Sequence, residues 1–462
     1  MSLTAADLFT DRRLLRRLAT ALLIVEPYLT TYAPTPSGAQ PVPRAPSVDR
    51  EHFLHHGELM FISEGALWDL DGATGKLTPL APAGEQPRDG QFSPNGRWLS
   101  YSLGSGQVWL ARSDGYGPRL VAEGGWDAWL PDGRLLAGEG VWAVSASGAL
   151  RRAGAVPSDL AGWSPDGKRY AFIDDSLVVS FSKPTTGTDR LQVSSSLYGK
   201  RVTWYESRVS FSAAGGSVGN FLDAVYVLPG TGPVLFTLGP FHSASLAADG
   251  LGLYEVRSPG APLVKLGVTV GDTLAVGPHG TFAFTNGPNR YAWLTKSAVT
   301  CSAATATCSP VPAPSGELTM YPTWAPQGIE LAFVEAPASS AGDFWQATVQ
   351  RWYGAHTLWV LPIGRPPFEV KGAAGASAPV WSADAKSLMY VADDSLWLLP
   401  VLSKKAVRIE SPLFQPGAWP SYYGQVNWSG QFAWSSRDDG PLVPPVTSGV
   451  GARSSRSVKY GK

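Results

Sequence analysis

A short turn sequence recurs along the chain and constrains the fold more than any other feature. Its consensus is an aromatic residue, a small residue, Pro, Asp or Asn, and Gly, followed by an apolar run, and single copies depart from it at one or two positions. Clear copies begin at Phe92, Trp129, Trp163, Trp324 and Trp381. Pro fixes φ at the first turn position, Asp or Asn bonds to nearby backbone, and Gly accepts a positive φ. The repeat therefore predicts many short antiparallel strands joined by tight turns.

Weaker copies of the turn begin at Phe211, Leu246, Val276 and Trp428. Equivalent positions in the nine copies are on average about 42 residues apart, within the range of roughly 40 to 50 for four-stranded propeller blades. The 51 Gly and 39 Pro residues disfavour long helices. Because the interval after Ala248 is short for four strands, we predict an all-β fold: a single β-propeller of about eight blades, with seven to nine tolerated.

The two ends of the propeller region complement each other. Glu58–Leu80 has strand patterns but no opening turn, whereas the copy at Trp428 has little chain after it. We therefore expect strands around Val426–Ser435 to complete the blade that the N-terminal strands begin. Such closure would remove exposed sheet edges. We also expect the aromatic residue before each turn to pack between neighbouring blades.

The five clear copies resemble the WD-like repeats of the TolB-type β-propeller superfamily, in which an aromatic-Ser-Pro-Asp-Gly turn opens each blade. The resemblance covers about residues 53 to 440. Since the motif is structural, the resemblance implies the fold and does not specify an activity. It also implies a protein-binding module outside the cytoplasm.

Residues 1–33 do not fit the repeat and predict an amphipathic helical arm. Its apolar stripe and basic residues are Leu8, Leu15, Leu18, Leu22 and Val25, with Arg12, Arg13, Arg16 and Arg17. Three alternatives stay open: a secretory signal or anchor with a small-residue site at Ser37-Gly38-Ala39, an arm that docks on a partner or an anionic membrane, and a solvated helix. We expect a Pro-rich linker at 34–50, the propeller at 51–440 and a flexible basic tail at 441–462.

The only two cysteines, Cys301 and Cys308, lie in a polar segment between predicted strands. This spacing favours a disulfide that closes a hairpin, and a disulfide would place the protein outside the cytosol. Free thiols are the alternative. A metal site is disfavoured because no His is near, and two thiolates do not complete a zinc site.

No pattern of catalytic residues stands out in the sequence. A Gly-x-Ser-x-Gly elbow and a Gly-rich phosphate loop are absent, and the six His residues predict no metal centre. Acidic pairs such as Asp174-Asp175 and Asp393-Asp394 fall where hairpin turns are expected, so we interpret them as turn residues rather than calcium ligands. We therefore predict no catalytic residues, no metal and no cofactor. The 37 basic and 37 acidic residues balance, which argues against nucleic-acid binding.

Two insertions rich in aromatic residues are the candidate binding loops. Their candidate contact residues are Phe344, Trp345, Arg351, Trp352 and Tyr353 in the first, and Trp419, Tyr422 and Tyr423 in the second. Insertions between propeller strands emerge on the faces, and Trp, Tyr and Arg dominate protein interfaces. The alternative is that these aromatic residues fold down and cap their own blades.

The leading hypothesis is a non-enzymatic scaffold that binds other protein subunits at the cell envelope or within a large extracellular, cell-surface or virion assembly. A membrane surface is a further candidate contact of residues 1–33. The alternatives are a carbohydrate-active or peptide-processing propeller enzyme and a lectin-like propeller that binds carbohydrate. An enzyme would bring carboxylates or His together in the central channel, whereas a scaffold would present an aromatic patch on one face.

Overall fold

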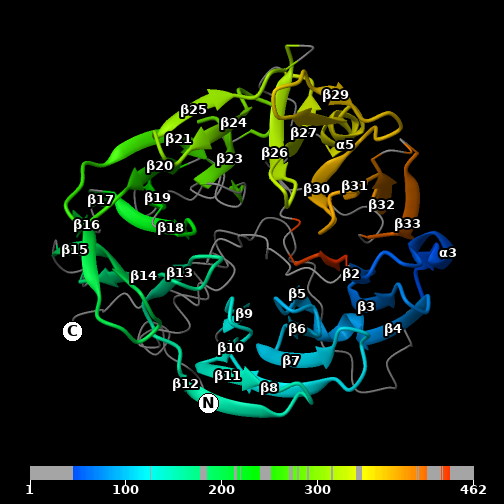
Figure 1. Ribbon diagram of the computed structural model, residues 1–462, viewed down its shortest axis with the longest axis horizontal. Helices are drawn as coiled ribbons and strands as arrows, with labels where there is room; N and C mark the ends of the chain where they lie inside the picture. The colour runs from blue at the N-terminus through cyan, green and yellow to red at the C-terminus, as the bar shows by residue number, and fades with distance from the viewer. Residues whose placement is uncertain are drawn as a thin grey trace, which may run out of the picture.

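The computed structural model describes residues 45–124, 126–176, 185–212, 216–218, 220–230, 232–239, 251–269, 274–277, 280–288, 291–313, 316–339, 346–401, 403, 405–413, 428 and 430–436. These residues form a ring of small antiparallel sheets, or blades, around a central axis (Figure 1). The predicted all-β propeller is confirmed. The predicted arm at 1–33 and tail at 441–462 lie outside the described residues.

The first four blades follow one another around the ring, and each is given from its innermost to its outermost strand. Blade 1 contains β34 (Phe432–Ser435), β2 (Glu58–Ser63), β3 (Ala66–Asp71) and β4 (Lys76–Ala81). Blade 2 contains β5 (Arg88–Phe92), β6 (Trp98–Ser102), β7 (Gln107–Arg112) and β8 (Arg119–Glu123). Blade 3 contains β9 (Trp126–Trp129), β10 (Leu135–Gly138), β11 (Gly140–Val144) and β12 (Leu150–Ala155). Blade 4 contains β13 (Leu160–Trp163), β14 (Tyr170–Asp175), β15 (Thr185–Ser194), β16 (Val202–Ser212) and β17 (Gly216–Val218).

The other four blades complete the ring. Blade 5 contains β18 (Phe221–Val227), β19 (Val234–Gly239), β20 (Leu251–Val256) and β21 (Val264–Thr269). Blade 6 contains β22 (Ala275–Val276), β23 (Thr281–Asn286), β24 (Ser297–Ser302) and β25 (Thr307–Pro310). Blade 7 contains β26 (Leu318–Trp324), β27 (Glu330–Ala336), helix α5 (Gln346–Gly354), β28 (Thr357–Pro362) and β29 (Phe368–Glu369). Blade 8 contains β30 (Ser377–Trp381), β31 (Ser387–Ala392), β32 (Ser395–Pro400) and β33 (Val407–Ser411), with β1 (Ser47–Val48) at its outer edge.

The number of blades follows from the pairing of the strands. Blades 5 and 6 belong to one hydrogen-bonded sheet because Thr269 on β21 pairs with Asn286 on β23. Among the described residues, this is the one pair between β21 and β23, and the strands on either side of it form separate four-stranded units. The described residues therefore form eight blades, the number that the sequence predicts.

The recurrent turn joins the innermost strand of a blade to its second strand. In blade 4 the hydroxyl of Ser164 donates to Asp166 Oδ1 at 2.6 Å and accepts the N–H of Arg169 at 3.0 Å. Ser382 makes the same two bonds in blade 8. The aromatic residue before the turn ends the innermost strand, as Trp163 does in β13, and its ring lies 6.5 Å from that of Trp126 in the neighbouring blade. The side chain thus packs between blades, as expected.

Three of the weaker copies are wrong as blade-opening turns. The copy at Phe211 begins within the last two residues of the outer strand β16. The one at Leu246 falls between β19 and β20, within residues 240–250 that lie outside the described ranges. The copy at Trp428 precedes β34, where the N–H of Gln431 bonds to Trp428 O at 3.1 Å. Because small residues and Gly serve turns of every kind, the weak pattern does not distinguish one connection from another.

The opening turn of blade 5 is instead Leu228–Pro233, which lacks the aromatic-Ser pair. The N–H of Leu228 donates to Pro233 O at 3.3 Å, and the N–H of Gly232 donates to Pro229 O at 3.3 Å. Leu130 closes the turn of blade 3 in the same way, through Arg134 O at 2.8 Å. The backbone bond is therefore sufficient for this turn, which is why pattern matching missed the copy in blade 5.

Both ends of the propeller region close the ring. Strand β34 pairs with β2 from Glu58↔Ser435 to Phe61↔Phe432, which confirms the predicted shared blade. On the other side, β1 pairs with β33, and the short helix α3 (Arg50–Phe53) leads from there to β2. Ser47–Val48, which lie in the predicted linker, therefore pair with β33 as part of blade 8.

Apolar side chains fill the space between neighbouring blades. All six residues of β2, β3, β19 and β31 are buried, because these second and third strands are covered on both faces by adjacent sheets. Phe53, Leu59 and Phe61 pack with Met389 and Leu396 across the junction of blades 1 and 8. The ring is thus stabilised by non-local packing as well as by its turns. Among the residues described, none of the helices has the length and apolar character needed to cross a bilayer.

Candidate functional site

The strand order defines two faces of the ring. The face that we call the turn face carries the connections from first to second and from third to fourth strands. The opposite face, which we call the loop face, carries the connections from second to third strands and those from a fourth strand to the first strand of the next blade. Residues 49–57, which join β1 to the start of β2, lie on the turn face, where Gly57 and Gly72 are hydrogen-bonded. Each blade contributes to both faces in the same sense, so connections can be compared around the ring.

The second-to-third connections on the loop face divide the ring into two halves. In blades 8, 1, 2 and 3 they are short: Asp393–Asp394, Glu64–Gly65, Leu103–Gly106 and Glu139. In blades 4 to 7 they are long and cover residues 176–184, 240–250, 287–296 and 337–356. These four blades are consecutive, from β13 to β29 around the ring (Figure 1). Insertions gathered on one face are typical of a binding surface.

Helix α5 forms the centre of the longest connection and packs against the neighbouring blade. The Trp352 side chain is 5% exposed, and its Nε1 donates to Pro337 O at 2.8 Å. Its ring lies edge-on to Trp293 of blade 6 with centroids 6.1 Å apart, and Tyr291 stacks on Trp293 at 5.4 Å. Long connections of two adjacent blades therefore meet in one aromatic cluster.

His356 holds the base of α5. Its ring is buried beneath Trp352, with centroids 4.3 Å apart, and its Nδ1 lies 3.1 Å from Ala376 O. Burial lowers the pKa of His356 to about 3, although the bond to Ala376 O opposes this shift. The imidazole is therefore neutral at physiological pH and serves as a packing residue rather than a proton carrier.

The predicted contact residues are placed unevenly. Arg351 is exposed on α5, Tyr353 is half-buried against His356, and Trp352 is buried. The burial of Trp352 matches the alternative in which the aromatic residue caps its own blade. The remaining candidates, Phe344, Trp345, Trp419, Tyr422 and Tyr423, lie outside the described residues.

Blade 4 contributes a projecting ribbon that is not among the predicted binding loops. Pairing of β14 with β15 stops at Asp175↔Asp189, but pairing of β15 with β16 continues to Thr185↔Phe211. The ends of β15 and β16 therefore project beyond the blade on the loop face, and β17 pairs with the projecting part of β16. The sequence signal for this ribbon is a pair of strand-like runs, at 185–194 and 202–212, that are longer than a blade needs.

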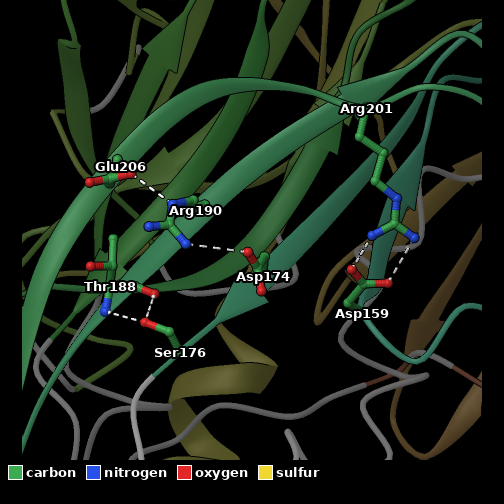
Figure 2. Close-up of polar contacts among 7 residues, drawn as sticks. All are labelled: Asp159, Asp174, Ser176, Thr188, Arg190, Arg201 and Glu206. Atoms are coloured by element: carbon green, nitrogen blue, oxygen red, sulfur yellow. Dashed lines mark hydrogen bonds and ion pairs between the residues drawn. The ribbon is translucent and has the colours of Figure 1, made fainter.

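Polar contacts secure the base of this ribbon, as Figure 2 shows. Arg190 on β15 lies between two carboxylates, with its Nε 2.7 Å from Glu206 and its Nη1 3.5 Å from Asp174. The Ser176 hydroxyl donates to Thr188 O at 3.0 Å and accepts the N–H of Thr188 at 2.7 Å. The ion pairs are partly exposed, so their role is to fix the direction of the ribbon more than to add stability.

A second arginine ties the outer strand of blade 4 to its inner edge. Arg201 forms a two-pronged ion pair with Asp159 (Figure 2), in which Nη2 lies 3.1 Å from Asp159 Oδ1. Its guanidinium lies 3.8 Å from the centroid of the buried Phe172 ring. Arg201 thus bridges the blade across an aromatic side chain, which further fixes the strands that carry the ribbon.

Two carboxylates, Asp89 on β5 and Asp127 on β9, lie on innermost strands of adjacent blades. Burial raises the pKa of Asp127 to about 8, which the Ser100 hydroxyl opposes and Asp89 reinforces. Burial also raises the pKa of Asp89, against the effects of Arg88 and Ser102. Both side-chain oxygens of Asp127 are buried, and with its pKa raised to about 8 this residue is largely protonated at neutral pH.

Cys301 and Cys308 face each other on β24 and β25 and form a disulfide. The predicted pairing is confirmed, and it lies at the turn-face end of blade 6. Within the ranges that the structure describes, no group of three or more His, Cys, Asp or Glu side chains is arranged to hold a metal ion.

No protein-family model matches the chain, and no curated protein sequence matches it. Among solved structures, it is similar to an oligogalacturonate lyase in complex with manganese, at 11% identity and TM-score 0.37 over 73% of this chain and 82% of the other. It is also similar to a putative TolB from Agrobacterium tumefaciens, at 12% identity and TM-score 0.33 over 81% and 94%. A prolyl endopeptidase is similar at 12% identity and TM-score 0.41 over 78% and 52%. Similarity of this size transfers neither a function nor a site residue to this chain.

Proposed function

We propose that this propeller is a non-enzymatic scaffold that binds another protein outside the cytoplasm, through the loop face of blades 4 to 7. The observation that carries the proposal is the unequal length of the second-to-third connections. In blades 8, 1, 2 and 3 the second-to-third connections are as short as Glu139 and Asp393–Asp394. A blade of this ring therefore forms without a long second-to-third connection. The additional residues in blades 4 to 7 are therefore available for recognition.

The described parts of these connections are anchored, which favours binding with little loss of conformational entropy. Trp352 and His356 fix α5, and Arg190 fixes the ribbon of blade 4. Arg351 on α5 and Arg208 near the end of β16 are exposed on these anchored elements. The disulfide between Cys301 and Cys308 supports a location in an oxidising compartment.

Site-specific photo-crosslinking in cells of the native source tests the proposal. A photoreactive phenylalanine analogue replaces Arg351 or Arg208 on the loop face, and Arg365 on the turn face serves as the matched control. We expect discrete adducts with the same protein from both loop-face positions and none from Arg365. Adducts from Arg365 alone, or none at any position, would contradict the proposal.

A further inference from the structure

The turn face carries an excess of positive charge. Its first-to-second and third-to-fourth connections contain four acids in the described residues, Asp114, Asp132, Asp166 and Asp384, and each forms an ion pair with a basic residue in or next to its own turn. The connection from β1 to β2, which ends on the same face, adds two further acids and one base, Asp49, Glu51 and Arg50. Further exposed basic residues in the same set of connections are Arg97, Lys200, Arg257, Arg365 and Lys405. Arg257 pairs with the buried Glu255 on β20, whereas the other four add positive charge that the acids of these turns do not balance.

The loop face has the opposite charge. Its described connections contain seven acids, which are Glu64, Glu85, Glu139, Asp159, Glu317, Asp393 and Asp394. Asp159 is paired with Arg201, and the basic residues of these connections are the exposed Arg351 and Lys371 and the buried Lys296. Arg208 on the projecting end of β16 is a further exposed base on this face. Within the described connections, acids therefore outnumber bases on the loop face, whereas bases outnumber acids on the turn face.

Exposed large apolar side chains gather on the basic face. Among the residues that the structure describes, the most exposed are Tyr116 at 67%, Ile363 at 64%, Ile329 at 59% and Tyr198 at 56%, and all four lie in turn-face connections. The two isoleucines are adjacent, because the N–H of Ile363 donates to Ile329 O at 2.8 Å. These residues belong to blades 2, 4 and 7, so they are distributed around the ring rather than joined in one patch.

We infer that the turn face docks on an anionic lipid bilayer. Apolar contacts at three separate blades of a ring define a plane, which fits a flat surface, whereas a protein partner favours a contiguous patch. Exposed Tyr and Ile side chains partition into the interface of a bilayer, and the surrounding Lys and Arg attract anionic headgroups. In this orientation the loop face points away from the membrane. The inference does not depend on the proposed protein partner.

Vesicle co-sedimentation of the full chain tests the charge requirement. We expect binding to vesicles of roughly one part phosphatidylglycerol to two parts phosphatidylcholine, with loss of binding in phosphatidylcholine alone and at high salt. The triple variant Lys200→Glu, Arg365→Glu, Lys405→Glu should bind about a hundred-fold more weakly. The matched control on the loop face, Arg351→Glu with Lys371→Glu, should retain binding. No binding by the parent, or equal binding by the triple variant, would overturn the inference.

A fluorescent label tests which face touches the lipid and separates the turn face from the N-terminal arm. Because both native cysteines form a disulfide, Ile363→Cys or Arg351→Cys supplies one free thiol for an environment-sensitive dye. We expect a blue shift on adding the anionic vesicles only for the Ile363→Cys label. A shift at Arg351→Cys alone, or at neither position, would mean that another surface binds. A shift of the Ile363→Cys label without vesicles, rising with protein concentration, would indicate stacking of copies instead.

Discussion

The turn face and the loop face of this propeller differ in how much their connections vary from blade to blade. On the turn face, first-to-second connections repeat one backbone bond, at 2.8 Å for Leu130 to Arg134 and 2.9 Å for Ser164 to Arg169. On the loop face, second-to-third connections vary from Glu139 alone to residues 337–356. The comparison shows that the geometry of the ring is set largely by one face. The other face is therefore free to vary in length and sequence.

The largest effect on stability is expected in blade 1, whose first and second strands, β34 and β2, come from opposite ends of the propeller region and are not joined by a turn. A chain that stops after Leu413 lacks β34, so β2 loses its partner along Glu58–Phe61 and blade 1 gains an open edge. We expect the melting temperature to fall by more than about 10 °C, or cooperative unfolding to be lost. Differential scanning calorimetry measures this. A control that stops after Ser436 keeps β34 and should melt like the full chain; equal melting of the two truncations would show that closure is dispensable.

The second-largest effect on stability is expected on the loop face, where the packing of α5 should contribute to the free energy of unfolding. Trp352→Ala removes a buried ring from the cluster with Trp293 and His356, and we expect a loss of about 3–5 kcal/mol in the free energy of unfolding. The exposed neighbour Arg351→Ala should change it by less than about 0.5 kcal/mol. Urea denaturation gives both values. Similar small losses for the two variants would mean that α5 does not pack as described.

A third test measures how stability depends on pH through Asp127, which lies on an innermost strand between the two faces. Asp127 has its pKa raised to about 8 by burial, so the folded state holds this proton more tightly than the unfolded state. The resulting stabilisation is complete below the ordinary carboxyl pKa of about 4 and is lost as pH rises through about 8.

The variant Asp127→Asn should therefore gain stability relative to the parent by more than about 1 kcal/mol between pH 5 and pH 8.5. Urea denaturation at the two pH values measures the difference. The exposed Asp132→Asn, which also removes a carboxylate, serves as the control and should show a smaller change. An identical pH response of parent and Asp127→Asn would contradict the placement of this carboxylate.

The smallest effect is expected within a single turn. Ser164→Ala removes the bonds from the Ser164 hydroxyl to Asp166 and from the Arg169 N–H, and should cost about 1 kcal/mol. Leu130 occupies the same position in blade 3, so the turn tolerates an apolar residue there. Chemical denaturation of Ser164→Ala and Ser382→Ala should give similar losses. A loss of several kcal/mol would show that the side-chain bonds, rather than the backbone bond, define the turn.

Much of the fold was predictable because its key signals are local. Five residues around Trp163 or Trp381 specify a turn without help from distant chain, and their repetition indicates the propeller and its number of blades. The disulfide was predictable because Cys301 and Cys308 are the only pair and lie in one hairpin. The opening turn of blade 5 was missed because Leu228–Pro233 relies on backbone bonds that many sequences can make.

The candidate site was less predictable because its properties depend on distant residues. The sequence by itself determined the aromatic content of the insertion around Trp352 and the turns that close the ring. Only the tertiary structure decided that Trp352 is buried against Trp293 of another blade and that Arg351 stays exposed. It also decided that basic turns and exposed isoleucines share one face. The physical reason is that a turn depends on bonds within a few residues, whereas burial and the charge of a face depend on how all the blades are arranged.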